Sequence, residues 1–138
     1  MIVLPDVNVL VAIAWPSHVH HATAAQWFDS VADEGWATCS VTEFGFVRMC
    51  LNPSVVGRAT DATSAITMLS RIRKIGRHSF WPDDCDAAAL SRVAGHIQGH
   101  RQVTDAQLAL TAERNDGRIA TLDAGMFARI GEAPLLIG

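Results

Sequence analysis

The sequence lacks a long uninterrupted apolar run, and it lacks positive charge at its start. Its longest apolar stretch, from Val7 to Trp15, contains Asn8 and is well short of the roughly 20 residues that a membrane-spanning helix needs. The first residues do not form the positively charged region of a secretory signal, and they reach Asp6 almost at once. We therefore expect a cytoplasmic protein with no membrane association.

Cysteine is also scarce. Cys39, Cys50 and Cys85 are odd in number and show no C-x-x-C spacing, which argues for reduced thiols and against a disulfide framework. Histidine is the other common zinc ligand, and three histidines lie close together: His18, His20 and His21. No cysteine accompanies them and they precede an amphipathic segment, so a solvated helix start is favoured over a zinc site.

Charged residues are few, and their distribution is uneven. They make up 18% of the 138 residues, and the net charge of −3 excludes a generally basic surface that coats nucleic acid. Four cations nevertheless lie within one short segment, with no acid between them: Arg71, Arg73, Lys74 and Arg77. This cluster predicts either a phosphate-binding patch for single-stranded RNA or a solvated helix end that the helix dipole stabilises. The sequence leaves both interpretations open.

Short apolar runs alternate with amphipathic segments along the chain. The apolar runs predict strands at 1–4, 36–39, 77–81 (an edge strand), 119–122 and 134–137. The amphipathic segments predict helices from residue 8 and at 18–32, 40–51, 60–75, 84–97, 103–115 and 124–130. This alternation favours a mainly parallel sheet covered on both faces. Because the chain shows no repeat or linker, we expect one α/β domain over residues 1–138.

Four acidic residues lie where the predicted strands end or where the next helices begin. Asp6 follows the first strand, Glu43 lies in the first turn after the second, and Asp123 follows the strand at 119–122. Asp105 opens the helix at 103–115. Ligands of such sheets bind outside the carboxyl ends of the strands, so we expect the four acids at one edge. Neutral oxygen donors accompany them: Asn8, Ser40, Thr104 and Thr121.

Each acid also has a structural explanation of its own. Ser40 and Glu43 fit a capping box, and Asp105 is favourable in the first turn of a helix. Asp6 fits a helix N-cap, and Asp123 fits a turn. For any single acid, the structural explanation is the stronger one.

Considered together, the four acids indicate a cation site. Four carboxylates at one sheet edge would repel one another unless a cation offset their charge. Carboxylate oxygens without thiolate or imidazole partners select Mg²⁺ or Mn²⁺ over Zn²⁺. Such a cation is the usual apparatus for phosphodiester hydrolysis, because it activates a water and neutralises charge on the phosphorus oxygens.

The segments around the acids follow one another in a recognisable order. They are residues 4–10 (LPDVNVL), 40–44 (SVTEF) with Arg48, 105–109 (DAQLA) and 121–127 (TLDAGMF). Together they resemble the PIN domain, and within it the VapC-type toxins of bacterial toxin-antitoxin pairs, over essentially the whole chain. One such motif is weak evidence, but four in this order are fairly specific.

The resemblance implies a metal-dependent endoribonuclease with a three-layer α/β/α sandwich. It also implies a homodimer and a cognate antitoxin whose C-terminal segment covers the acidic site. The catalytic acids, which would bind Mg²⁺ or Mn²⁺, are by position Asp6, Glu43, Asp105 and Asp123, with Asn8 and Thr121 as polar supports. Many relatives carry a further acid soon after the fourth. Positions 124–126 are Ala, Gly and Met here, so that ligand for a second metal is missing.

Two other functions fit parts of the sequence. Asp6-x-Asn8 after a first strand is similar to the nucleophile segment of haloacid dehalogenase-type phosphatases, but that chemistry needs an acid where Asn8 stands. A non-catalytic α/β interaction domain, in which the acids are caps, is the second alternative. The helix at 40–51 is richer in apolar residues than one buried stripe needs, which indicates contact with a partner or a second copy through Phe44, Phe46, Val47 and Met49.

Overall fold

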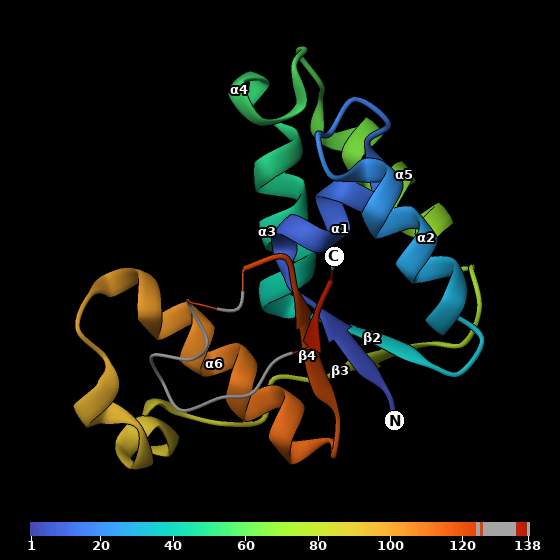
Figure 1. The fold of residues 1–138 in the computed structure, drawn as a ribbon. Coiled ribbons are helices and arrows are strands. Elements are labelled where there is room, and N and C mark those ends of the chain that lie inside the picture. Colours follow the sequence, from blue (N-terminus) through green and yellow to red (C-terminus); the bar gives the residue numbers. More distant parts are fainter. Residues whose placement is uncertain (124, 126–134, 138) are drawn as a thin grey trace.

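The chain forms a parallel sheet with helices on both faces (Figure 1). This computed structural model describes residues 1–123, 125 and 135–137. The strands of this part are β1 (Val3–Pro5), β2 (Trp36–Cys39), β3 (His78–Trp81), β4 (Arg118–Thr121) and β5 (Leu135–Leu136). Their order in the sheet is β3-β2-β1-β4-β5, and every neighbouring pair is parallel. The carboxyl ends of these strands therefore share one edge.

Two layers of helices enclose the sheet. The α-helices are α1 (Val7–Ala14), α2 (His21–Val31), α3 (Ser40–Cys50), α4 (Pro53–Val56), α5 (Ala62–Ile72) and α6 (His100–Arg114). Helices α1, α2, α3 and α5 pack against one face, whereas α6 packs against the other, together with the 3₁₀ helices η1 (Ala87–Arg92) and η2 (Ala94–His96). The result is the three-layer α/β/α architecture.

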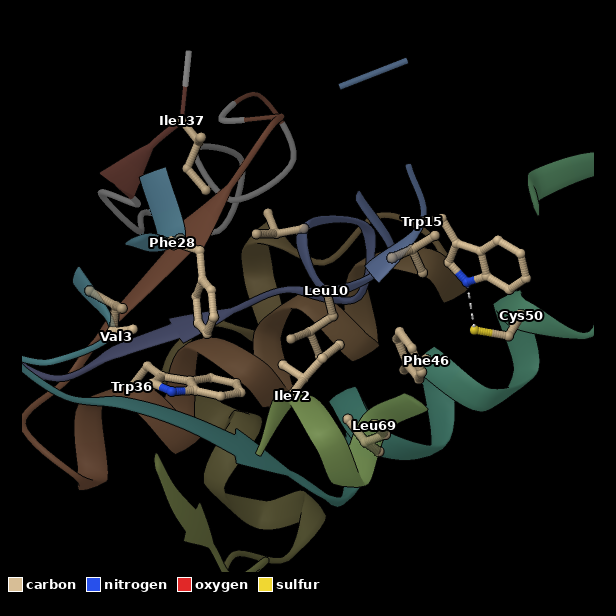
Figure 2. Close-up of a cluster of buried hydrophobic side chains, with 14 of the residues drawn as sticks. Val3, Leu10, Trp15, Phe28, Trp36, Phe46, Cys50, Leu69, Ile72 and Ile137 are labelled. Atoms are coloured by element: carbon tan, nitrogen blue, oxygen red, sulfur yellow. Dashed lines mark hydrogen bonds between the residues drawn. The ribbon is translucent and has the colours of Figure 1, made fainter. Parts of the chain in front are cut away.

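Alternation along each strand divides the core into two clusters. Val3 and Ala120 belong to the cluster under α1, α2, α3 and α5, whereas Leu4 belongs to the cluster under α6. Figure 2 shows the first cluster, in which Phe28 meets Trp36 edge to face with ring centroids 4.9 Å apart. Both sheet faces are thus buried, as the apolar runs in the sequence require.

The predicted fold class is confirmed. Strand β2 occupies the predicted residues 36–39, and the segment predicted at 77–81 is the edge strand β3. The structure also contains the short helix α4, which the sequence analysis did not predict; Asn52 caps it and Pro53 begins it. The helix predicted at 124–130 lies outside the described residues, apart from Gly125.

The α-helix predicted at 84–97 is wrong. This segment forms η1 and η2, and neither contains a buried residue. Three consecutive alanines favour a helix locally, but Leu90, Val93 and Ile97 are only partly buried against the core, so packing anchors the segment too weakly to extend an α-helix here. The neighbouring α6 begins at His100 with Gly99 as its N-cap, three residues before the predicted start at 103. Asp105 therefore does not lie in a first turn.

The cysteines match the sequence analysis. Cys39 and Cys50 are buried, Cys85 is half-buried, and all three are free thiols. The Trp15 indole N–H donates to the Cys50 sulfur at 3.2 Å (Figure 2). No helix among residues 1–123 is long and apolar enough to cross a membrane.

Candidate functional site

Asp6 stands where β1 ends and α1 begins. Its Oδ1 accepts a hydrogen bond from the Val9 backbone N–H at 3.1 Å, so the predicted N-cap is confirmed. Its Oδ2 accepts from the Thr121 hydroxyl at 2.6 Å. Burial raises the pKa of Asp6 above its ordinary value, and the hydrogen bonds from Thr121, Val9 and Asn8 oppose that shift. Capping thus uses one oxygen of Asp6, and the other faces β4.

Thr121 joins Asp6 to Asp123. It is the last residue of β4 and is 1% exposed, and its Oγ1 accepts the Asp123 backbone N–H at 3.0 Å. Asp123 is exposed, and its Oδ1 accepts the Gly125 N–H at 3.1 Å, which confirms the predicted turn. Because β1 and β4 are parallel neighbours, their carboxyl ends place the two acids at the same edge. The Asn8 side chain is exposed on α1.

Asp105 reaches this edge from α6 on the opposite face of the sheet. The residue is 6% exposed, and its Oδ2 is buried with no hydrogen-bond partner among the described residues. Burial raises the pKa of Asp105 to about 6, and the charges of Asp6 and Asp123 add to the shift. The structure therefore brings three of the four predicted acids into one electrostatic group. A buried carboxyl with an unpartnered oxygen is rare in native proteins and calls for an explanation.

Glu43 lies in the first turn of α3, just after β2. The capping box predicted for Ser40 and Glu43 is wrong, because the N-cap is Cys39 and the box is completed by Thr42. The carboxylate is therefore not used for capping. Strand β2 is the parallel neighbour of β1, so Glu43 follows a strand at the same edge as Asp6.

The partners of Glu43 in the described structure come from β2 and from the end of α5. The Thr38 hydroxyl donates to Oε2, and the Arg73 guanidinium donates to Oε1 at 3.3 Å. His78 on β3 lies behind Thr38, with its Nε2 2.7 Å from the Thr38 Oγ1. Burial lowers the pKa of His78, Arg73 acts in the same direction, and Glu43 opposes the shift. The sequence analysis did not select Thr38 or His78; a polar residue inside an otherwise apolar strand was the available signal.

The acids fit a hard divalent cation chemically, although they do not form a ready-made cage. Among residues 1–123, 125 and 135–137, no three His, Cys, Asp or Glu side chains are arranged as a metal-binding group. This also holds for the histidines at 18–21. The Asp105 carboxyl, however, has an oxygen with no hydrogen-bond partner among the described residues, and it is close enough to Asp6 and Asp123 for their charges to raise its pKa. Oxygen donors of this kind suit Mg²⁺ or Mn²⁺.

One residue of the basic cluster reaches the acidic edge. Arg71 lies in the last turn of α5 and Arg73 is its C-cap, and both are exposed, as are Lys74 and Arg77. Arg73 extends from this cluster to Glu43 and also lies 5.7 Å from the ring centroid of Phe80. The predicted helix-end position is therefore confirmed, and Arg73 connects the cluster to an acid of the candidate site. Arg77, in contrast, directly precedes β3 and lies at the amino-terminal ends of the strands, where its carbonyl accepts the Trp36 backbone N–H.

An apolar groove of about 550 Å³ lies between α3 and α5. Phe44, which is 73% exposed, and the half-buried Val47 line it, together with Leu51 and Ile66. Glu43 and Arg73 are also among its lining residues, so the groove reaches the acidic edge. Phe46, in contrast, is fully buried in the core and is not part of this surface.

Comparison with known proteins places this geometry in context. A model of the family described as "PIN domain" matches residues 3–133. Ribonuclease VapC38 of Mycobacterium tuberculosis strain H37Rv is 44% identical over 95% of this chain and 92% of its own. Ribonuclease VapC39 of the same strain is 43% identical over 91% of each chain. Ribonuclease VapC29 is 42% identical over 99% of this chain and 97% of its own.

Solved structures support the same fold. FitAcB from Neisseria gonorrhoeae has a TM-score of 0.61 at 21% identity and covers 98% of this chain and 96% of its own. VapBC2 from Rickettsia felis, solved with a DNA fragment from its promoter, has a TM-score of 0.63 at 16% identity, with coverages of 98% and 97%. At this level of identity, the likeness concerns the fold alone.

Proposed function

This chain belongs to the PIN domain family, and from that premise we propose that it is an endoribonuclease toxin that hydrolyses RNA phosphodiester bonds at the edge formed by Asp6, Glu43, Asp105 and Asp123. Its relatives at 42–44% identity are named ribonucleases. The observation that carries the proposal is the buried Asp105 carboxyl, whose Oδ2 has no hydrogen-bond partner among the described residues and whose pKa is raised by the charges of Asp6 and Asp123. Buried side-chain oxygens without a partner are uncommon in native proteins and call for an explanation such as a cation-binding site.

The reaction is proposed to depend on Mg²⁺ or Mn²⁺, held by Asp6, Asp105 and Asp123 with Glu43 at the neighbouring strand end. When bound, such a cation supplies charge neutralisation at the phosphate and a water of lowered pKa. Thr121 fixes the orientation of Asp6 through the 2.6 Å hydrogen bond and holds the Asp123 backbone in place. Asp105 retains a proton in the metal-free site up to about pH 6, and that proton must leave before both oxygens can act as ligands.

The basic cluster is proposed to hold the RNA strand next to the acids. Arg71, Lys74 and Arg77 are exposed to solvent, and Arg73 pairs with Glu43, so a strand held by the cluster would approach the site at that acid. Contacts with phosphates position a strand and carry no sequence information, so this surface sets affinity more than cut-site choice.

A cognate antitoxin is proposed as the protein partner. The groove between α3 and α5 supports a protein contact, because it is apolar, open and continuous with Glu43. A segment lying in this groove would reach the acidic edge and block access of RNA to it. A homodimer is also expected, and light scattering of the purified chain measures it directly.

The test is cleavage of single-stranded RNA by wild type and by four variants, Asp6→Asn, Glu43→Gln, Asp105→Asn and Asp123→Asn. Each reaction is run with Mg²⁺, with Mn²⁺ and with EDTA. Each variant should lose at least about 100-fold in rate, because residues that act as one unit fail together. Asp61→Asn is the matched control: Asp61 also caps a helix, with its Oδ1 2.7 Å from the Ser64 N–H, but it lies on α5 and is exposed.

Wild-type activity that requires the metal, survives in Asp61→Asn and is lost in the site variants would support the proposal. Absence of cleavage by the wild type under all metal conditions would leave the interaction-domain alternative. Near wild-type rates in any two of the four variants would show that the catalytic acids lie elsewhere.

A further inference from the structure

Glu43 is held from the sheet side by two side chains to which the proposed function assigns no role. Thr38 lies within β2, is 0% exposed, and donates its hydroxyl to the Glu43 Oε2. His78 lies on the neighbouring strand β3, half-buried, with its Nε2 2.7 Å from the Thr38 oxygen. The three side chains therefore form a continuous line from β3 through β2 to α3.

The direction of the hydrogen bonds in this line follows from the donor inventory. A carboxylate oxygen can only accept, so the single hydroxyl proton of Thr38 points to Glu43. The Thr38 oxygen must then accept from His78, which requires the proton of the neutral imidazole to be on Nε2. The resulting chain is His78 Nε2–H to Thr38 Oγ1–H to Glu43 Oε2.

The two ends of this hydrogen-bond chain are held in different ways. The His78 ring meets the Trp36 ring at a centroid distance of 4.7 Å and an interplanar angle of 62°, and Trp36 is fully buried. The other oxygen of Glu43 is held by Arg73, at a longer 3.3 Å and through a side chain that is 40% exposed. The hydrogen bond from the buried Thr38 therefore sets the orientation of the carboxylate, whereas the ion pair with Arg73 is longer and partly exposed to solvent.

We propose that Thr38 and His78 are positioning residues that hold the Glu43 carboxylate in the orientation that RNA cleavage uses. This inference rests on the proposed function, since it gives Glu43 a part in that reaction. Thr38 acts by direct contact with Glu43, and His78 acts through Thr38. Neither residue needs to touch the RNA.

Thr38→Val is the first test, because valine keeps the volume and the β-branched shape of a buried strand residue while removing the hydroxyl. We expect kcat for RNA cleavage to fall about 10- to 100-fold, the range typical for partners that orient a ligand, with KM changed less than about threefold. Thr38→Ser restores the hydroxyl and should recover kcat to within about threefold of wild type. Thr111→Val is the matched control, since Thr111 is also buried but donates to the Gln107 carbonyl within α6.

A double-mutant cycle with His78→Phe tests the order of the chain. Phenylalanine preserves the ring packing on Trp36 and removes the donor. His78→Phe should lower kcat by itself but add less than about twofold in the Thr38→Val background, because its effect passes through the hydroxyl. If the two substitutions lowered kcat by independent factors in the double variant, the hydrogen-bond chain would be overturned. A Thr38→Val protein with wild-type kcat would overturn the positioning role.

Nitrogen-15 NMR of the His78 ring gives a readout that does not need RNA. The wild type should show the Nε2–H form, and Thr38→Val should lose that fixed preference, whereas Thr111→Val should keep it. A wild type that cleaves no RNA overturns the proposed function, and with it the part of Glu43 in cleavage. In that case the His78 spectrum still decides the hydrogen-bond chain, because an unchanged ring in Thr38→Val overturns it.

Discussion

The chemistry of Asp105 is set by where its side chain is buried. The carboxyl is enclosed at the sheet edge, its Oδ2 has no partner among the described residues, and it faces the charges of Asp6 and Asp123. Burial first, and then the two charges, disfavour the ionised form and raise the pKa to about 6 from its ordinary value of 3.8. A proton bound in the folded state and absent from the unfolded state links this residue to overall stability.

We expect the metal-free wild type to be less stable near pH 7.5 than near pH 5. Because the folded pKa of Asp105 lies above its unfolded value, the stabilisation by its proton is complete below about pH 4 and is lost as the pH rises through about 6. Asp6, whose pKa burial also raises, acts in the same direction. Asp105→Asn should therefore be more stable than wild type at pH 7.5 by about 2 kcal/mol, and the difference should shrink toward pH 4. Urea unfolding in EDTA at several pH values measures it.

Asp61→Asn is the control for this prediction, because the pKa shift of Asp61 has the opposite sign to that of Asp105. The hydrogen bonds of Ser64 lower the pKa of Asp61, so its contribution is present at neutral pH and is lost as the pH falls. This variant should gain no stability at pH 7.5. An Asp105→Asn protein that is weaker than wild type at pH 7.5 would contradict the repulsion between the acids.

The sequence could predict where the four acids lie relative to the strands but not their environments. Asp6 and Asp123 follow strands, and strand ends are visible in the apolar pattern. The helix start was misplaced, so Asp105 resembled an ordinary first-turn acid, whereas its burial depends on α6 packing across the sheet. The role of Thr38 depends on a contact with His78, 40 residues away along the chain, which local pattern cannot supply.

At the scale of helices and strands, prediction succeeded where an apolar stripe met the core. Helix α5 was predicted at 60–75 and observed at Ala62–Ile72, with Ala65, Leu69 and Ile72 buried. The segment at 84–97 has helix-forming residues but buries none in η1 or η2, and there the prediction failed. Tertiary packing, more than propensity, decides which helical segments become α-helices.

Close contact between α3 and α1 allows a stability test near the site. A Cβ at Gly45 would lie 2.6 Å from the Val7 Cγ2, and Val7 directly follows Asp6. Alanine is normally the better helix residue by about 1 kcal/mol, but here the clash should dominate and Gly45→Ala should cost about 1 to 3 kcal/mol. Adding Val7→Ala should recover part of the loss. Urea unfolding measures all three proteins.

Gly95→Ala serves as the control for this substitution, because no heavy atom of the described residues, apart from its own local backbone and chain neighbours, lies within 4 Å of the position of its Cβ. It should change stability by less than about 0.5 kcal/mol. If Gly45→Ala were as stable as wild type, α1 and α3 would not be as tightly packed as described.

The end of α5 offers a test of RNA contact. Replacing Arg71 and Arg77 by Gln should weaken RNA binding and lower the salt slope of the affinity by up to about 1.4 units, because each phosphate contact on a single strand contributes about 0.7. Arg58→Gln with Arg114→Gln removes the same charge away from the cluster, since Arg58 stacks on Trp15 and Arg114 pairs with Asp84. Equal slopes in the two double variants would leave the cluster as a solvated helix end.

For the molecule as a whole, the proposed cation couples stability to the acidic edge. Strands β1, β2 and β4 and helix α6 all contribute an acid or its support, so binding there holds both helical layers to the sheet. A cation that binds the folded state alone raises the free energy of unfolding by roughly 2.7 kcal/mol when its free concentration is about 100 times Kd. This gain needs no RNA and no antitoxin.

At pH 7.5, the order of the melting temperatures of the wild type and Asp105→Asn should therefore differ between EDTA and Mn²⁺. In EDTA, Asp105→Asn should melt above wild type, because it removes a buried charge beside Asp6 and Asp123. In Mn²⁺ the melting temperature of the wild type should rise more, because the variant lacks one ligand. The wild type should then melt above Asp105→Asn. Asp61→Asn should follow the wild type in both conditions. A capping or turn role for the acids predicts no response to Mn²⁺ in any of the three proteins, so the reversal separates a cation site from four unrelated local features.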